Sequence, residues 1–177
     1  MSDSKKEFLG ELKAQYEKEF ELKNSLENKA NYLLVASGIV AGLLFSFGAN
    51  LSEEFSKGVY FAYIIASLVI GTSLFVVAIL CSALALKVSL YRYATIHKIF
   101  YNSDGTFNED NKTDYKSMGS DEFLDNRIDE YLRSNKQNFE KNEYKASKIK
   151  VAHRLFFTGM VTVPITISLF AVGSIFK

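Results

Sequence analysis

Three long runs without a charged residue constrain this chain more than any other feature. They cover Ala30–Ser52, Gly58–Leu86 and Leu155–Phe176, and they are 23, 29 and 22 residues long. As helices they would measure roughly 34, 43 and 33 Å, against a bilayer hydrocarbon core of about 30 Å. A soluble fold of 177 residues has no room to bury three helices that are apolar nearly all round. The runs therefore predict three membrane spans rather than a soluble helical bundle.

Basic residues are distributed unevenly around these runs, which predicts the orientation. Residues 1–29 hold six lysines, the link between the first two runs holds only Lys57, and residues 87–154 hold thirteen Lys and Arg. Basic segments stay on the cytoplasmic side. The first 29 residues are charged throughout, so we expect no cleavable signal peptide and an uncleaved first span. The prediction is a multi-pass protein of the inner membrane with its N-terminus inside and its C-terminus outside.

The expected fold class is an all-α integral membrane protein whose cytoplasmic helical extensions form a stalk or bundle. Ser120 is a good N-cap for the last extension, with Asp121 and Glu122 in its first turn. In chain order we expect a cytoplasmic amphipathic helix (1–29), a span (30–52), an external loop (53–57), a span (58–86), a helical extension (87–101), a flexible loop (102–120), a cytoplasmic helix (121–154) and a span (155–176).

The last extension carries two rows of residues at heptad spacing, and together they predict a stalk seam with polar interruptions. Such a seam fits packing against the other cytoplasmic extensions or against a neighbouring subunit. One row is Ile128, Asn135, Asn142 and Ile149, and the other is Leu132, Phe139, Ala146 and His153.

Small residues in the first two spans predict close helix packing. Gly38 and Gly42 form a GxxxG pattern that Ser46 continues, and Gly71 lies in the second span. Small side chains let the backbones of membrane helices approach closely. We therefore expect a close-packed face between spans one and two.

The third span contains the single proline of the chain, Pro164. It removes a backbone hydrogen bond to the carbonyl of Met160. Thr158, Thr162 and Thr166 form a row beside it. One interpretation is a kinked span whose threonines satisfy the freed backbone. The other is a hinge or a polar pore stripe that moves on activation, and such an uncharged stripe would select weakly by charge.

The sequence offers no chemistry for an enzyme, a cofactor or a metal site. None of the three runs contains an ionisable Asp, Glu, Lys, Arg or His, which argues against pumps and ion-coupled transporters. The acidic stretch 104–114 does not match a calcium loop, and Cys81 is the single cysteine. His97 and His153 are isolated histidines for which a paired site is a minor alternative. Acidic and basic residues are interspersed, so direct nucleic-acid binding is not expected.

Two stretches carry a resemblance to a known class of proteins. They are LKNSLENKANYLLVASGIVAGLLF, which begins at Leu22, and DNRIDEYLRSNKQNFEKNEYKASKIKVAHRLFFTGM, which begins at Asp125. This pattern of a charged helix ending at Lys29 and Ala30, a close pair of spans and a Lys-rich helix resembles the SLATT-type and Pycsar-type transmembrane effectors of prokaryotic conflict systems. The resemblance implies that a cytoplasmic signal, often a nucleotide made by a partner enzyme, drives effector assembly and loss of membrane integrity.

The leading hypothesis is thus a non-enzymatic effector that oligomerises and disrupts the inner membrane in antiviral defence. Its partners would be the lipid bilayer, further copies of the chain and a cytoplasmic signalling enzyme or sensor. The alternative is a membrane anchor, scaffold or accessory subunit, including a small channel subunit, without pore activity of its own.

Overall fold

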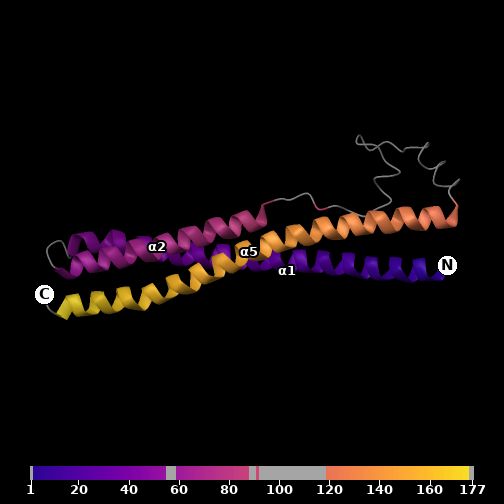
Figure 1. The fold of residues 1–177 in the computed structure, drawn as a ribbon. Helices are drawn as coiled ribbons and strands as arrows, with labels where there is room; N and C mark the ends of the chain where they lie inside the picture. Colours follow the sequence, from indigo (N-terminus) through magenta and orange to yellow (C-terminus); the bar gives the residue numbers. More distant parts are fainter. Residues whose placement is uncertain (1, 55–58, 88–90, 92–118, 176–177) are drawn as a thin grey trace, which may run out of the picture. The chain divides into compact units, whose positions relative to one another are not determined.

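The computed structural model describes residues 2–54, 59–87, 91 and 119–175, and these form helices and no strand. The helices are α1 (Ser2–Glu54), α2 (Val59–Leu86) and α5 (Ser120–Ile175) (Figure 1). In the described part of the chain, three helices are long and apolar enough to cross a membrane. The predicted all-α class with three spans is confirmed.

The chain divides into two compact units. The charged unit comprises Met1–Asn24 with Ser89–Glu143, and the span unit comprises Ser25–Val88 with Tyr144–Lys177. Of the predicted extension at 87–101 only Lys87 and Tyr91 are described, and of the predicted loop at 102–120 only Gly119 and Ser120. The other residues of these two segments lie outside the described residues.

The helices begin and end where hydrogen bonding allows. The first backbone bond of α5 runs from Phe123 N to the carbonyl of Gly119 at 3.0 Å, so Gly119 takes the cap position that we predicted for Ser120. Asp121 and Glu122 lie in the first turn as expected. The C-terminal end of α2 is closed by the hydrogen bond from Lys87 N to the Ala83 carbonyl, at 2.9 Å.

Within the span unit, α1 and α5 run parallel and α2 runs antiparallel to both. Leu26 and Ile149 share one apolar cluster, and the Phe47 and Phe170 ring centroids lie 5.4 Å apart. Both contacts keep the same sequence offset, which only parallel helices do. The α2–α5 contacts instead pair rising with falling numbers, as in the Phe75–Phe156 ring pair at 5.7 Å. This arrangement is that of a chain that crosses, returns and crosses again.

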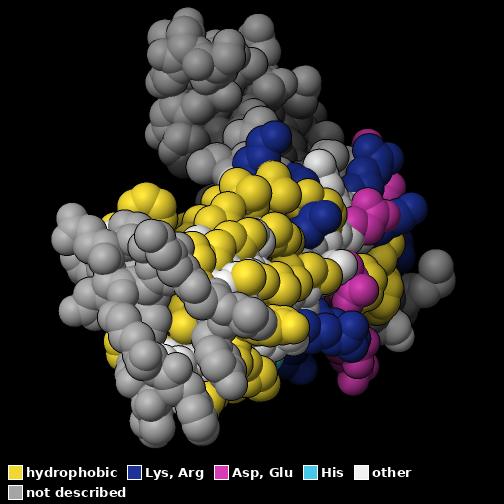
Figure 2. All heavy atoms as spheres, turned by 90° about the vertical axis from the view of Figure 1, so that its left-hand side faces the viewer, with side chains coloured by type: hydrophobic (Ala, Val, Ile, Leu, Met, Phe, Trp, Pro, Cys, Tyr) yellow, Lys and Arg dark blue, Asp and Glu magenta, His cyan; other side chains and the backbone are white. Residues whose placement is uncertain are grey.

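The span unit buries a narrow apolar core and leaves most of its surface apolar. The buried core residues Leu44, Ile64, Leu68 and Phe75 pack together. Hydrophobic side chains cover much of the outer surface that faces the viewer in Figure 2. Only 17%, 28% and 11% of the apolar windows of the three spans are buried inside the chain. Contact between such a large apolar surface and water would cost much free energy, so lipid or other protein must cover it.

The charged unit packs α1 against the first half of α5. Leu9, Leu12, Leu124 and Tyr131 form its apolar cluster. Outside the cluster, Lys5 Nζ lies 2.8 Å from a carboxylate oxygen of Asp125. The hydrogen bond to Asp125 raises the pKa of Lys5 above its ordinary value. Such an exposed pair contributes little to stability, since solvent screens it.

Candidate functional site

Two asparagines fix the register of α1 and α5 in the charged unit. Asn135 Nδ2 donates to the Leu12 carbonyl at 3.0 Å, and Asn142 Nδ2 donates to the Glu19 carbonyl at 2.8 Å. The two bonds are one heptad apart on both helices. A polar residue in the core of a helix pair specifies its register at a cost in stability. The two asparagines therefore allow one alignment of α1 with α5 in this unit.

The buried face of α5 follows a strict heptad. In the row that begins at Leu124, every seventh residue is buried as far as Gly173. In the charged unit this face is apolar at Leu124 and Tyr131 and polar from Ser134 to Asn142. Asn138 is fully buried, and Ser134 Oγ and Asn135 Oδ1 are buried without a hydrogen-bond partner. The full row is Leu124, Tyr131, Asn138, Lys145, Ala152, Gly159, Thr166 and Gly173.

The α1–α5 contact in the charged unit, which we call the polar seam, is therefore weakly held. A buried polar atom without a partner costs roughly 1–3 kcal/mol. The polar seam contains two such atoms, on Ser134 and Asn135. It combines a specified register with a low free energy of separation.

Only part of the predicted stalk seam packs inside the chain. The row of Ile128, Asn135, Asn142 and Ile149 faces the interior, where Ile128 is half-buried and the other three are buried. The buried partner row lies one residue earlier than the predicted one. Leu132 and Phe139 are 44% and 51% exposed and His153 is also exposed, while Ala146 is half-buried against the cluster of Leu26 and Ala30.

This difference has a physical reason. Hydrophobicity favoured Leu132 and Phe139 for the seam, but Asn138 and Lys145 take the buried places, and Lys145 has a polar partner there. Lys145 Nζ donates to Glu27 Oε1 within the span unit. Packing of Leu132 and Phe139 inside the chain is not observed, and their packing against a neighbouring subunit stays a prediction.

A buried tyrosine cluster lies on the polar seam. The Tyr91 hydroxyl donates to Asn142 Oδ1 at 2.6 Å, while Asn142 Nδ2 also donates to Glu19 Oε2 at 2.7 Å. The Phe20 ring centroid lies 5.9 Å from that of Tyr91. Lys23 Nζ and Lys141 Nζ lie 5.1 and 5.5 Å from the Tyr91 ring centroid. An aromatic ring, two ammonium groups and an oriented amide thus meet at one place.

In the span unit, α2 and α5 pack closely at two glycines. A Cβ added to Gly71 would lie 2.4 Å from Thr162 Oγ1, and one added to Gly159 would lie 2.9 Å from the Phe75 ring. The hydroxyls of Ser67 and Thr166 are 2.9 Å apart. Gly71 therefore allows the close contact between α2 and α5. A Cβ added to it would also lie 3.5 Å from the Leu44 side chain of α1.

The threonine row beside Pro164 is split between two environments. Thr166 is buried against α2, Thr162 is half-buried and Thr158 is exposed. Thr162 Oγ1 donates to the Gly159 carbonyl at 2.6 Å, and Thr166 Oγ1 donates to the Thr162 carbonyl at 2.8 Å. Such back-bonding to the helix bends it slightly. Pro164 lies inside the continuous helix α5, and a hinge at this place stays a proposal.

The GxxxG face of α1 is open in the single chain. Gly38, Gly42 and Ser46 are exposed, and nothing lies within 4 Å of a Cβ added to either glycine. The closest approach of an α1 glycine to α2 is at Gly48, where an added Cβ would lie 3.5 Å from Leu68. Close packing at the GxxxG pattern is not formed by the described residues of the single chain and stays a prediction.

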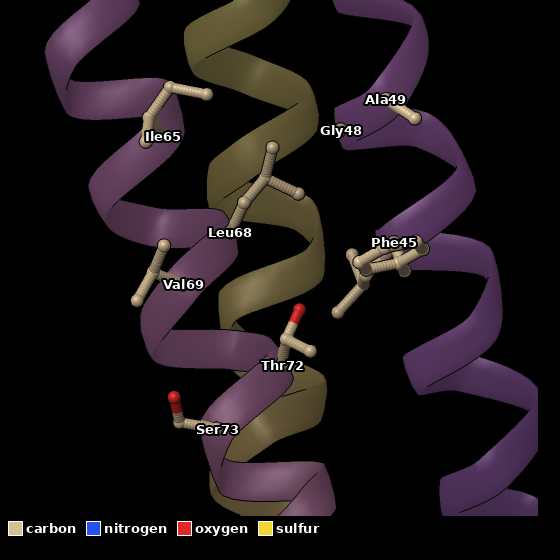
Figure 3. A pocket seen from close by; sticks show the side chains of 9 residues that line it. Phe45, Gly48, Ala49, Ile65, Leu68, Val69, Thr72 and Ser73 are labelled. Atoms are coloured by element: carbon tan, nitrogen blue, oxygen red, sulfur yellow. The ribbon is translucent and has the colours of Figure 1, made fainter.

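Two apolar grooves run between helices of the span unit. One, of about 340 Å³, lies between α1 and α2, where Leu68 and Thr72 of α2 face Phe45 of α1 (Figure 3). The other, of about 570 Å³, lies between α1 and α5, with Leu43 and Met160 on its walls. Both grooves are open and are lined by apolar side chains. Surfaces of this kind pack against lipid acyl chains or other helices.

Comparison with known proteins decides the family. The family model described as the Pycsar effector protein domain (PycTM) matches residues 12–172. The chain belongs to the Pycsar effector family. No curated protein and no solved structure matches it. Pycsar effectors are membrane effectors of antiphage defence that respond to a cyclic nucleotide signal. Together with its three spanning helices, this makes the chain a multi-pass protein of the inner membrane.

The Pycsar effector family is not a known enzyme class. Among the described residues, no group of three or more His, Cys, Asp or Glu could hold a metal ion. His97 and the acidic stretch 104–114 lie outside the described residues. His153 contacts Phe157, with ring centroids 4.6 Å apart.

Sequence reasoning missed the tyrosine cluster of this effector. Tyr91 lies in the segment 87–101, for which we expected a helical extension, but nothing local in the sequence pairs it with Asn142. The sequence contained only an indirect signal for this cluster. Asn135 and Asn142 occupy core places of a heptad, and a buried amide requires partners. A search for those partners would have led to α1 and to Tyr91.

Proposed function

We propose that this Pycsar effector is a signal-gated protein that oligomerises in the inner membrane and disrupts its barrier. The family match supports the defence role and the cyclic nucleotide trigger. The observation that carries oligomerisation is the low burial of the spans, of which 28% at most is buried inside the chain. Three such helices enclose no lumen, so a pathway through the bilayer requires several copies.

The proposed orientation places the charged unit in the cytoplasm, where the signal arises. The positive-inside distribution of lysines supports it. The parallel course of α1 and α5 in the span unit adds that the two ends of the chain lie on opposite sides of the membrane. The C-terminus then lies outside, and the polar seam lies where a soluble nucleotide reaches it.

The proposed gating step is separation or realignment of the polar seam. Its asparagines permit one register, and its unpaired polar atoms lower the free energy needed to leave it. Because α5 is one helix from Ser120 to Ile175, movement at the seam reaches the third span. Pro164 and the threonines beside it are the proposed place where that span bends.

Leu132 and Phe139 supply a proposed interface between subunits. They are exposed on the charged unit, which lipid does not cover in the proposed orientation. Large apolar side chains that are exposed to water and lie seven residues apart on one helix are typical of a helix–helix interface. We propose that they pack against the stalk of a neighbouring subunit.

The double variant Leu132→Asp with Phe139→Asp is expected to reduce the effector to smaller assemblies. Both side chains are exposed, so the fold of the single chain should tolerate the change. Chemical crosslinking in membranes and size-exclusion chromatography with light scattering measure the subunit number. Lys136→Asp, between them on an exposed position of the same helix, is the control. An unchanged assembly in the double variant would remove this interface.

Proteoliposomes test the function directly. The full chain is reconstituted with a potassium gradient and a voltage-sensitive dye, and each of the four 3′,5′-cyclic ribonucleoside monophosphates is added. We expect rapid depolarisation with at least one nucleotide. Pro164→Ala should retain assembly and lose most of the depolarisation if the hinge acts. Nucleotide binding without depolarisation would favour the anchor or accessory subunit, and depolarisation at full rate by Pro164→Ala would remove the hinge.

A further inference from the structure

Tyr91 occupies a position whose surrounding side chains could also bind a small ligand. It is the one described residue between 88 and 118, and it is 6% exposed. Its hydroxyl is bound by Asn142 and its ring is flanked by two lysine ammonium groups. We call the residues around it the Tyr91 site: Glu19, Phe20, Lys23, Lys141 and Asn142.

The amide of Asn142 is held in one orientation. Its nitrogen donates to the Glu19 carbonyl at 2.8 Å and to Glu19 Oε2 at 2.7 Å. Its oxygen is therefore turned toward the Tyr91 hydroxyl and acts as an acceptor. If Tyr91 left, this buried acceptor would need another N–H or O–H donor, because an unpaired buried acceptor is costly. An amino or imino N–H of a nucleobase is such a donor.

The two lysines supply positive charge at the same place. None of the ion pairs among the described residues includes Lys141. Desolvation by burial lowers the pKa of Lys141, so its ammonium group lacks part of its hydration. An anion bound beside Lys141 and Lys23 would restore favourable electrostatics. A phosphodiester with one negative charge is small enough to be shared by two ammonium groups.

The aromatic part of the site completes the match to a nucleotide. Phe20 packs against the ring of Tyr91 and presents a surface on which a planar base can stack. The site thus matches the three parts of a cyclic nucleotide. The acceptor suits the base edge, the aromatic ring suits the base face, and the two cations suit the phosphate.

We propose that Tyr91 is a built-in competitor that fills a cyclic nucleotide site in the resting chain, and that the nucleotide displaces it. This inference rests on the proposed function, because it assigns that signal to a place. The phosphate lies between Lys23 and Lys141, the base stacks on Phe20, and a base N–H replaces the tyrosine hydroxyl at Asn142 Oδ1. Asn142 also holds the register of the polar seam, so exchange of occupants there acts on the gating element.

Competition predicts opposite signs for two kinds of variant. Isothermal titration of the full chain in nanodiscs with each of the four 3′,5′-cyclic ribonucleoside monophosphates measures affinity. Lys23→Ala with Lys141→Ala should weaken binding at least tenfold. Tyr91→Ala should strengthen it several-fold, because the competitor is gone. Tyr91→Phe, which keeps the ring and loses the hydroxyl, should fall between wild type and Tyr91→Ala. Lys13→Ala with Lys136→Ala, exposed lysines of the same helices, should match wild type.

The outcomes separate this inference from the proposed function. Wild-type binding that the Lys23 and Lys141 changes leave intact would place the site elsewhere and keep the proposed trigger. Weaker binding by Tyr91→Ala, with helicity by circular dichroism unchanged, would show that Tyr91 is no competitor and overturn the proposal. If neither wild type nor Tyr91→Ala bound any of the four nucleotides, both the site and the cyclic nucleotide trigger would be overturned.

Discussion

Gly71→Leu is expected to abolish depolarisation by this Pycsar effector and to lower its thermal stability by several degrees. A Cβ added at Gly71 would clash with Thr162 Oγ1, so a leucine forces α2 and α5 apart. Overpacking of a tight core costs about 1–3 kcal/mol. The separation also breaks the contact between the Ser67 and Thr166 hydroxyls one turn away. Heating in detergent with a thiol-reactive dye measures stability, because Cys81 is the single cysteine and lies half-buried in α2.

Gly42→Leu is the matched control in the same unit. Nothing lies within 4 Å of a Cβ at Gly42, so the midpoint of Cys81 labelling should stay within about 1 °C of wild type, as expected for a surface substitution. The two glycines thus separate packing inside the chain from packing between copies. Equal midpoints for Gly71→Leu and wild type would contradict the α2–α5 contact. A stable Gly42→Leu chain that no longer assembles would assign the GxxxG face of α1 to a subunit interface.

The membrane fold could be predicted from the sequence because its cause is local. An uncharged run of about 20 residues has few alternatives to a spanning helix, and the described residues of all three runs lie in the long helices α1, α2 and α5. The directions of the three helices could be predicted as well, because a chain that crosses the membrane three times reverses its direction at each crossing. The register row of Asn135 and Asn142 was also recognisable, since heptad spacing identifies the buried face of a helix.

The rest depends on contacts that sequence spacing does not contain. Hydrophobicity placed Leu132 and Phe139 in the seam, but the buried places belong to Asn138 and Lys145, and a partner on a distant segment satisfies Lys145. Lys145 reaches Glu27 across 118 positions. Likewise Tyr91 reaches Asn142 across 51 positions. A polar residue becomes a core residue only through such partners, so the choice between adjacent heptad rows requires the three-dimensional arrangement.

Asn135→Leu is expected to make the effector harder to activate. Asn135 is 4% exposed, and its Oδ1 has no hydrogen-bond partner. Leucine removes this unpaired atom and adds apolar contact to the cluster that contains Leu12. The Leu12 carbonyl, which loses the Asn135 donor, stays within α1 and keeps its helical hydrogen bond. The polar seam should therefore gain about 1–3 kcal/mol of stability.

If activation requires the seam to separate, this gain appears as a higher threshold. A difference of about 1.4 kcal/mol corresponds to a tenfold change in an equilibrium, so roughly ten times more cyclic nucleotide should be needed for half-maximal depolarisation of proteoliposomes. Gln137→Leu makes a comparable amide-to-leucine change on an exposed position of α5 and should leave the threshold unchanged. A stabilised Asn135→Leu chain with the wild-type threshold would mean that the polar seam stays closed during activation. The signal would then have to reach the spans by another route than α5.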